Sequence, residues 1–224
     1  MCKKCKPHPT LLHVDGFSLE KENGIEGKEV NDNNKTVKVN NAHVDIPRES
    51  DNGSGILLQS ILPVIVTQKG VNIPVKTYAF YDNGNTGCFI TECLKECFEA
   101  ESQDVKLQLG TIQGNTLVES ALVKDLVVTD VNGDSPVELP RVYTRNEISA
   151  DHEQIPSPSM VNRIEHLKEI ASEISPLNPE LEIGLLVGSN CPNALLPLCV
   201  VPNKGVGPFA VRLSMAGRSA VHFI

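Results

Sequence analysis

One acidic residue of the chain stands between an apolar segment and a turn of small residues. Residues 77–81 form the apolar segment, Asp82 follows at once, and Asn83 and Gly84 continue into the turn. A strand end holds a carboxylate rigidly, and Gly lets the backbone approach a substrate and an opposing carboxylate. Two such carboxylates share one proton, so that one activates water while the other hydrogen-bonds a peptide carbonyl. Asp82 is therefore a candidate for peptide-bond hydrolysis.

The tripeptide Asp-Asn-Gly alone is a weak signal because it is also a common turn. A second copy, Asp51-Asn52-Gly53, has no apolar segment before it. We interpret this second copy as a turn within a linker. The strand that precedes Asp82 is the feature that distinguishes the two copies.

Short apolar segments and turn residues around Asp82 predict a mainly β fold. Residues 62–68 and 73–81 are expected to form a hairpin across Lys69-Gly70. Residues 91–100 are expected to form a short helix with Thr91 as its N-cap. Further strands are predicted at residues 105–112, 115–123, 126–131, 181–187, 209–215 and 220–224.

Composition divides the chain into three parts. Residues 1–13 carry closely spaced Cys and His, and residues 14–55 are rich in Asn, Glu, Lys, Asp and Gly, which is typical of a disordered linker. Residues 56–224 form the predicted domain. Within it, residues 136–179 are interpreted as an insertion with one helix at about 159–174, whose apolar residues share a face.

The charge balance limits the expected partners and location. The 224 residues include 20 Lys+Arg and 28 Asp+Glu, a net charge of -8 at pH 7. General binding of nucleic acid or of an anionic membrane needs clustered Lys and Arg, so neither partner is expected. No apolar run approaches the roughly 18 residues that cross a bilayer, and the start of the chain has no apolar targeting segment. We expect a cytoplasmic location.

The seven cysteines are odd in number and scattered, unlike the framework of a secreted disulfide-rich protein. Reduced thiols are expected. No local motif of a Cys–His protease surrounds any of them.

A series of motifs follows in order from residue 57 to about residue 211. The motifs are residues 61–63, residues 81–85 with 89–91 behind them, residues 137–143, residues 151–156, residues 183–190 with 192–194, and residues 207–211. This series resembles the aspartic peptidase domain of Pao/BEL-type retrotransposon polyproteins, a relative of retroviral proteases. An ordered series over most of the chain is far more specific than Asp-x-Gly.

The resemblance implies a retroviral-type acid protease-like barrel, with a short helix after the active turn and a partly helical insertion. Asp82 matches the catalytic Asp, and Asn83, Gly84 and Gly188 match residues that support the active turn. Each subunit would supply one Asp, so the resemblance implies a homodimer that cleaves a polypeptide, the parent polyprotein, without a cofactor. The hairpin at residues 109–117 corresponds to the flap that closes over substrate.

Two departures from the family's pattern leave a second function open. The family has Ser or Thr after the catalytic Asp, whereas this chain has Asn83, whose amide differs from a hydroxyl in its donors and acceptors. Residues 212–218 also differ from the family's continuation. The alternative is a catalytically inactive peptidase-fold domain that acts as an interaction module.

The first residues are similar to the last part of the zinc-knuckle segment that precedes the peptidase in such polyproteins. The residue types that bind Zn²⁺ tetrahedrally are present as Cys2, Cys5, His8 and His13. Pro7 and Pro9 restrict the intervening loop, so we predict no metal site and interpret residues 1–13 as a remnant. Nucleic-acid binding through this tail is a third alternative, which the charge balance disfavours.

Overall fold

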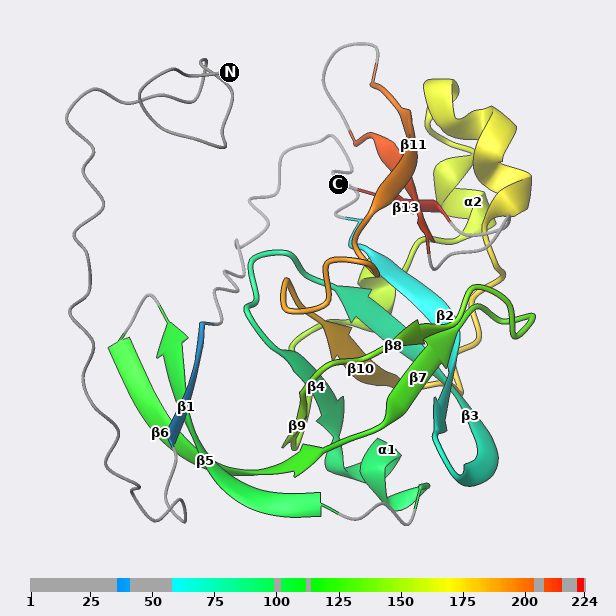
Figure 1. Ribbon diagram of the computed structural model, residues 1–224. Helices are drawn as coiled ribbons and strands as arrows, with labels where there is room; N and C mark the ends of the chain where they lie inside the picture. The colour runs from blue at the N-terminus through cyan, green and yellow to red at the C-terminus, as the bar shows by residue number, and fades with distance from the viewer. Residues whose placement is uncertain are drawn as a thin grey trace, which may run out of the picture. The chain divides into compact units, whose positions relative to one another are not determined.

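The computed structural model describes residues 36–40, 58–98, 102–111, 114–203, 208–214 and 221–223 (Figure 1). Strands dominate these residues, which confirms the mainly β class predicted from the sequence. The strands form a ten-stranded mixed sheet and a separate three-stranded sheet. The zinc-knuckle-like segment and Asp51 lie outside the described residues.

The ten-stranded sheet has the order β1-β5-β6-β9-β4-β10-β3-β2-β7-β8. Neighbouring strands are mostly antiparallel, but β1 with β5, β4 with β9 and β10 with β3 are parallel pairs. The strands are β1 (Thr36–Asn40), β2 (Ile61–Gln68), β3 (Val71–Tyr81), β4 (Cys88–Thr91), β5 (Ser102–Thr111), β6 (Gly114–Val123), β7 (Leu126–Thr129), β8 (Val137–Glu138), β9 (Val142–Arg145) and β10 (Ile183–Val187).

The second sheet is antiparallel and comprises β11 (Pro197–Val201), β12 (Ala210–Leu213) and β13 (Val221–Phe223). The helical elements are α1 (Glu92–Glu96), α2 (Pro158–Val161) and two 3₁₀ helices, η2 (His152–Gln154) and η3 (Glu165–Glu173). α2 lies beside the smaller sheet in Figure 1, and a shared apolar cluster that includes Val161, Leu167 and Ala210 joins the helices to β12. Within the described part of the chain, no helix is long and apolar enough to cross a membrane.

The hairpin of β2 and β3 forms as the sequence predicts. Its turn includes Gly70, whose φ of +84° lies in the left-handed region that suits glycine. Along β3, side chains alternate between two apolar clusters: Tyr78 and Phe80 belong to one, and Ala79 and Tyr81 belong to the other. The strand is therefore fixed on both faces up to the residue before Asp82.

β10 lies between β3 and β4, parallel to the first and antiparallel to the second. All of its residues are buried, which explains the continuous apolar sequence Ile-Gly-Leu-Leu-Val. Gly184 is required by close packing, because a Cβ there would lie 2.6 Å from the hydroxyl oxygen of Thr77. The end of β3 is thus held by a strand more than a hundred positions further along the chain.

The short helix after the active turn begins where the sequence predicts. The side chain of Thr91 accepts a hydrogen bond from the backbone N–H of Leu94, at 3.2 Å, and so caps α1. The helix ends at Glu96, earlier than the predicted boundary at residue 100. Leu94 is its buried residue and fixes α1 against the sheet.

The single helix predicted at residues 159–174 is wrong. The structure has a short α2 and then η3, separated by Ile164 in an extended conformation with φ -97° and ψ 108°. Ile164, Leu167 and Ile170 are three positions apart, as are Ala171 and Ile174. This spacing fits a 3₁₀ helix, in which residues i and i+3 share a face. The shared apolar face itself is observed, because these side chains pack in one cluster.

Several strands form where the sequence predicts none. β1 lies within the 14–55 segment, for which no regular structure is expected, and β8 and β9 lie within the predicted insertion. β11 begins at a proline, a residue that disfavours a strand interior. These strands have only two to five residues each, so the local pattern carries little signal for them.

Candidate active site

Asp82 lies at the end of β3, half-buried at the surface of the sheet. Its backbone N–H donates to the carbonyl of Val187, at 3.0 Å, so the last residue of β10 holds the start of the turn. The five preceding residues, 77–81, are all buried. A packed strand therefore presents this carboxylate at a fixed position, as acid–base catalysis requires.

The turn after Asp82 leaves much of the carboxylate free. The backbone N–H of Gly84 donates to Asp82 Oδ1 at 2.9 Å, and the N–H of Asn85 donates to the Asp82 carbonyl at 3.2 Å. No described residue bonds to Oδ2. Asn83 and Gly84 are exposed. The carboxylate is oriented by one hydrogen bond and remains open to an additional partner.

Gly188 packs directly against this turn. A Cβ at Gly188 would lie 2.3 Å from the backbone oxygen of Gly87 and 2.7 Å from that of Asn85, distances that no real Cβ tolerates. Beside it, the N–H and the hydroxyl of Ser189 both donate to the Asn85 carbonyl, at 2.8 and 3.0 Å. The turn after β10 thus lies against the turn after β3, and the close contact requires glycine.

Asn85 is a residue of the site for which the sequence patterns predict no role. Its side chain is fully buried, and its Oδ1 accepts the Gly87 N–H at 3.3 Å. Its Nδ2 is buried without a hydrogen-bond partner among the described residues. The feature of the sequence that points to Asn85 is its position at the end of the turn sequence Asp82-Asn83-Gly84-Asn85. Asn85 stabilises the loop that joins Asp82 to β4.

Asp82 borders an apolar pocket of about 550 Å³ on one side. Tyr81, Asp82 and Asn83 contribute to it from the active turn, and the three-stranded sheet contributes the far wall. The lining is completed by Leu58, Gln59, Ser60, Phe80, Leu195, Pro197, Val200, Phe209, Val211 and Leu213. This pocket offers apolar contacts next to the carboxylate.

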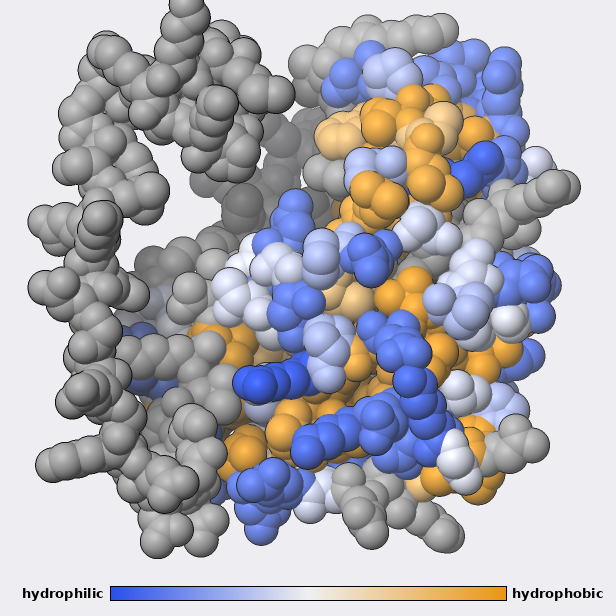
Figure 2. Space-filling view, in the orientation of Figure 1, coloured by the Kyte–Doolittle hydropathy of each residue, from blue (hydrophilic) through white to orange (hydrophobic). Residues whose placement is uncertain are grey.

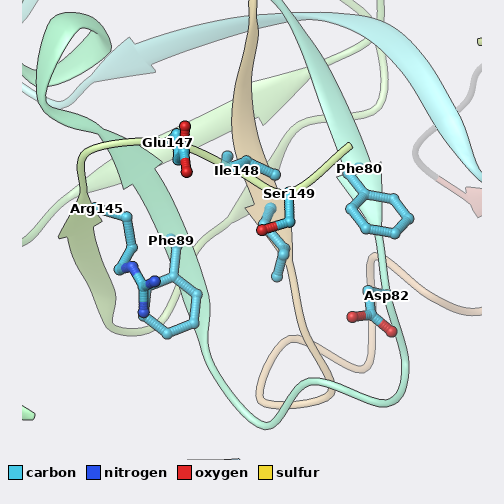
Figure 3. Close-up of a pocket in the computed structure, with 8 residues that line it drawn as sticks. Phe80, Asp82, Phe89, Arg145, Glu147, Ile148 and Ser149 are labelled. Carbon is cyan, nitrogen blue, oxygen red and sulfur yellow. The ribbon is translucent and has the colours of Figure 1, made fainter. Parts of the chain in front are cut away.

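A second, smaller pocket of about 20 Å³ lies on another side of Asp82. It is lined by Phe80, Asp82, Phe89, Arg145, Glu147, Ile148, Ser149 and Leu186. Figure 3 shows the Arg145 guanidinium over the Phe89 ring on one side and the Asp82 carboxylate on the other. The guanidinium carbon lies 5.9 Å from the ring centroid, within cation–π range. The sequence offered no signal for Arg145, because the strand that carries it was not predicted.

Asp130 is an aspartate of the same fold whose carboxylate has a structural role, and it provides a comparison for Asp82. It is buried, and its Oδ1 accepts the backbone N–H groups of Asn132 and Asp134, at 2.9 and 2.8 Å. Both bonds close the turn after β7. The Asp130 carboxylate is therefore committed to the backbone, whereas Asp82 has one such bond and borders two pockets.

The apolar surface next to the larger pocket is centred on β11. Every residue of this strand except Val201 is exposed, and β12 is its one neighbour among the described strands. Leu196, Leu198 and Val200 are exposed by 54%, 60% and 50%. Figure 2 shows the hydrophobic colour gathered over this strand. An exposed apolar edge strand is a common site of association with another chain.

The five described cysteines, at positions 88, 93, 97, 191 and 199, are free thiols. Cys88 lies near the active turn, where its Sγ donates to Asn190 Oδ1 at 3.0 Å. Burial raises the pKa of Cys88 to about 12, and burial also raises the pKa of Cys191. Both thiols therefore stay protonated near neutral pH and are poor nucleophiles.

Among the described residues, no group of three His, Cys, Asp or Glu is placed to hold a metal ion.

The rate of alkylation should differ between the buried and the exposed thiols. At pH 8, iodoacetamide is expected to modify Cys88 more than about 10³-fold more slowly than the exposed Cys199, because the thiolate is the reactive form. Cys93 is exposed, but the negative charge of Glu182 raises its pKa, so Glu182→Gln should accelerate its modification. Mass spectrometry of timed digests measures the three rates. Equal rates for Cys88 and Cys199 in the folded protein would contradict the burial of Cys88, and denaturant should equalise them.

The structure brings some, but not all, of the site residues predicted from the sequence close to one another. Asp82, Asn83 and Gly84 form one turn, and Gly188 contacts that turn from β10. The predicted flap hairpin is present as β5 and β6, but none of its described residues lines either pocket.

No protein-family model, no curated protein and no solved structure matches the chain. The function must therefore be inferred from the residues and geometry of the chain itself.

Proposed function

We propose that the protein is an aspartic endopeptidase that is active as a homodimer, with Asp82 of each subunit in one shared site. The observation that carries the proposal is the half-buried Asp82 carboxylate. It lies at the end of a strand whose last five residues are buried, has one backbone hydrogen bond, and borders two pockets. Asp130, with its carboxylate bonded twice to its own turn, has none of this freedom.

The proposed chemistry needs two Asp82 carboxyl groups that share one proton. The ionised carboxylate removes a proton from water, whose oxygen attacks the carbonyl carbon of the peptide bond. The protonated carboxyl hydrogen-bonds the carbonyl oxygen and stabilises the negative charge that develops there. When the C–N bond breaks, the proton taken from water passes to the departing amine. The products are a carboxylic acid and an amine.

The strand arrangement around Asp82 supports a retroviral-type acid protease-like barrel. β10 inserts between β3 and β4, and Gly188, directly after it, lies against the turn that begins at Asp82. This arrangement agrees with the support of the active turn that the family resemblance implies for Gly188. We assign the flap role to the hairpin of β5 and β6 on the resemblance alone.

The second copy is proposed to seat on the β11 surface and the apolar pocket next to it. Leu195, Pro197 and Val200 line that pocket together with Asp82 and Asn83, so one continuous apolar surface leads from the edge strand to the catalytic turn. A copy that covers this surface would bring its own Asp82 close to the first. Asn83 is exposed at the same place, where it would face the partner.

A single charged substitution on the β11 surface tests the proposed dimer interface. Leu198→Glu should shift the chain from dimer to monomer and weaken association at least about tenfold, because burying an unpaired carboxylate is costly. Light scattering over a concentration series measures the equilibrium. Ile73→Glu is the matched control, since Ile73 is 48% exposed but lies on β3. A dimer that tolerates Leu198→Glu as well as Ile73→Glu would rule out this interface.

The activity is tested by incubating the full chain with capped peptides between pH 4 and pH 7 and analysing the products by mass spectrometry. The endopeptidase proposal expects internal cleavage that pepstatin inhibits. The alternative, an inactive interaction domain, expects a folded dimer without cleavage, which Asn83→Ser could restore. A folded dimer that cleaves nothing under these conditions would favour the alternative.

A further inference from the structure

The smaller pocket beside Asp82 is lined by Arg145, whose guanidinium has no ion-pair partner among the described residues. Arg145 is only partly exposed, and its Nη1 atom is buried without a hydrogen-bond partner among the described residues. None of the ion pairs between described residues includes it. A buried guanidinium nitrogen without an acceptor is costly and uncommon. Such a group needs an explanation, and an absent ligand would supply one.

The guanidinium is held in place by its surroundings. The ring of Phe89 lies beneath it, and Phe89 is itself buried between β9 and β10. Arg145 is the last residue of β9, whose position is fixed by pairing with β4. An arginine fixed in this way loses little conformational freedom when it binds an anion. The pocket is therefore preorganised for an acceptor.

The shape and charge of the pocket restrict the ligand. At about 20 Å³ it has room for a small polar group rather than for a large side chain. The charged groups that face it are Arg145, Asp82 and Glu147. A carboxylate that reaches Nη1 of Arg145 gains a charge-assisted hydrogen bond, and this bond has to outweigh the repulsion from Asp82 and Glu147. A basic group at the same atom would meet a donor and no acceptor.

We propose that Arg145 selects peptides with an acidic side chain near the bond that Asp82 cleaves. The inference rests on the proposed function, because it identifies Asp82 as the reacting group of a peptide site. Arg145 is a specificity residue here and takes no part in the proton transfers. The substrate class is thus a polypeptide with Glu or Asp close to the scissile bond.

The test measures binding, so that it does not depend on cleavage. Fluorescent capped peptides that carry one Glu at successive positions, and matched Gln peptides, are titrated with the full chain bearing Asp82→Asn. At one position or more, Glu should bind at least about tenfold more tightly than Gln, the effect of a charge-assisted hydrogen bond. A version with a free C-terminus and no internal acid separates side-chain recognition from terminal-carboxylate recognition. Preference for the terminal carboxylate alone would overturn the proposal.

Substitutions on the protein side identify the residue. Arg145→Gln should remove the Glu preference, and Arg145→Glu should favour a Lys peptide in its place. Glu147→Gln should strengthen the Glu preference, because a facing negative charge is removed. Arg163→Gln, an exposed arginine of the insertion, is the matched control and should change nothing. Circular dichroism of each variant shows that it is folded, and unchanged binding of the Gln peptide shows that its site is intact, so a lost Glu preference is then due to the substituted side chain.

The two proposals can fail separately. A Glu preference that Arg145→Gln removes, with no cleavage by the wild type, would support the inference and count against the peptidase. Cleavage by the wild type with equal binding of Glu and Gln peptides would support the peptidase and overturn the role of Arg145.

Discussion

Asp82→Asn is expected to lower the rate of peptide cleavage by about 10²- to 10⁴-fold, the usual contribution of a positioned acid–base group. Asn has nearly the same shape as Asp, and its Oδ1 can still accept the Gly84 N–H that orients Asp82. The fold and the dimer should therefore persist while the exchangeable carboxyl proton is lost. Initial rates on one capped peptide, with circular dichroism of both proteins, measure the effect.

Asp104→Asn is the matched control, because Asp104 is exposed on β5 and lines neither pocket. It should cleave at the wild-type rate. Mixing the wild type with excess Asp82→Asn should also lower the rate per wild-type chain, since mixed dimers have only one carboxyl group at the site. Equal rates for wild type and Asp82→Asn would refute the catalytic role of Asp82.

Gly188→Ala is expected to lower the free energy of unfolding by about 3 kcal/mol, at the upper end of overpacking effects. The added Cβ would lie 2.3 Å from the Gly87 oxygen and 2.7 Å from the Asn85 oxygen, and both are backbone atoms that cannot rotate away. For a chain of this size the loss corresponds to a fall in Tm of roughly 10 °C. Cleavage should fall as well, because the displaced loop carries Asp82.

Gly70→Ala separates this clash from the general effect of replacing a glycine. Gly70 has a φ of +84° and no atom within 4 Å of an added Cβ, so only backbone strain is expected, about 1 kcal/mol. Cleavage by Gly70→Ala should match the wild type. If thermal unfolding shows Gly188→Ala to be no less stable than Gly70→Ala, the close packing of the two turns is wrong.

The combined results decide between the two functions that the sequence leaves open. Cleavage that depends on Asp82 and on the β11 surface supports the homodimeric endopeptidase. A stable dimer that responds to Leu198→Glu and cleaves no peptide supports an interaction domain. In the second case Asn83, exposed where the partner is proposed to lie, is the first residue to replace.

Much of the site's framework could be predicted locally. The hairpin of β2 and β3 follows from alternating apolar segments around Gly70, and the start of α1 follows from Thr91. Both depend on interactions within a few residues, which a single sequence displays directly. The placement of Asp82 at the end of a strand is of the same kind.

Other parts required the folded chain. The type of helix at residues 165–173 was mistaken because spacings of three and of 3.6 residues differ little over so short a segment. Strands of two to five residues, such as β8 and β9, have too few positions for a pattern. They form because longer strands, β7 beside β8 and β6 beside β9, offer hydrogen-bond partners.

The sequence by itself determined that Asp82 follows an apolar strand and begins a turn of small residues. Only the tertiary structure decided what surrounds that residue. Gly188 and Ser189 reach the turn from beyond the end of β10, where Ser189 lies 104 positions after Asn85, and Arg145 reaches the smaller pocket from β9. The physical reason is that strand pairing brings distant segments together through long-range hydrogen bonds and packing, which local side-chain patterns do not encode.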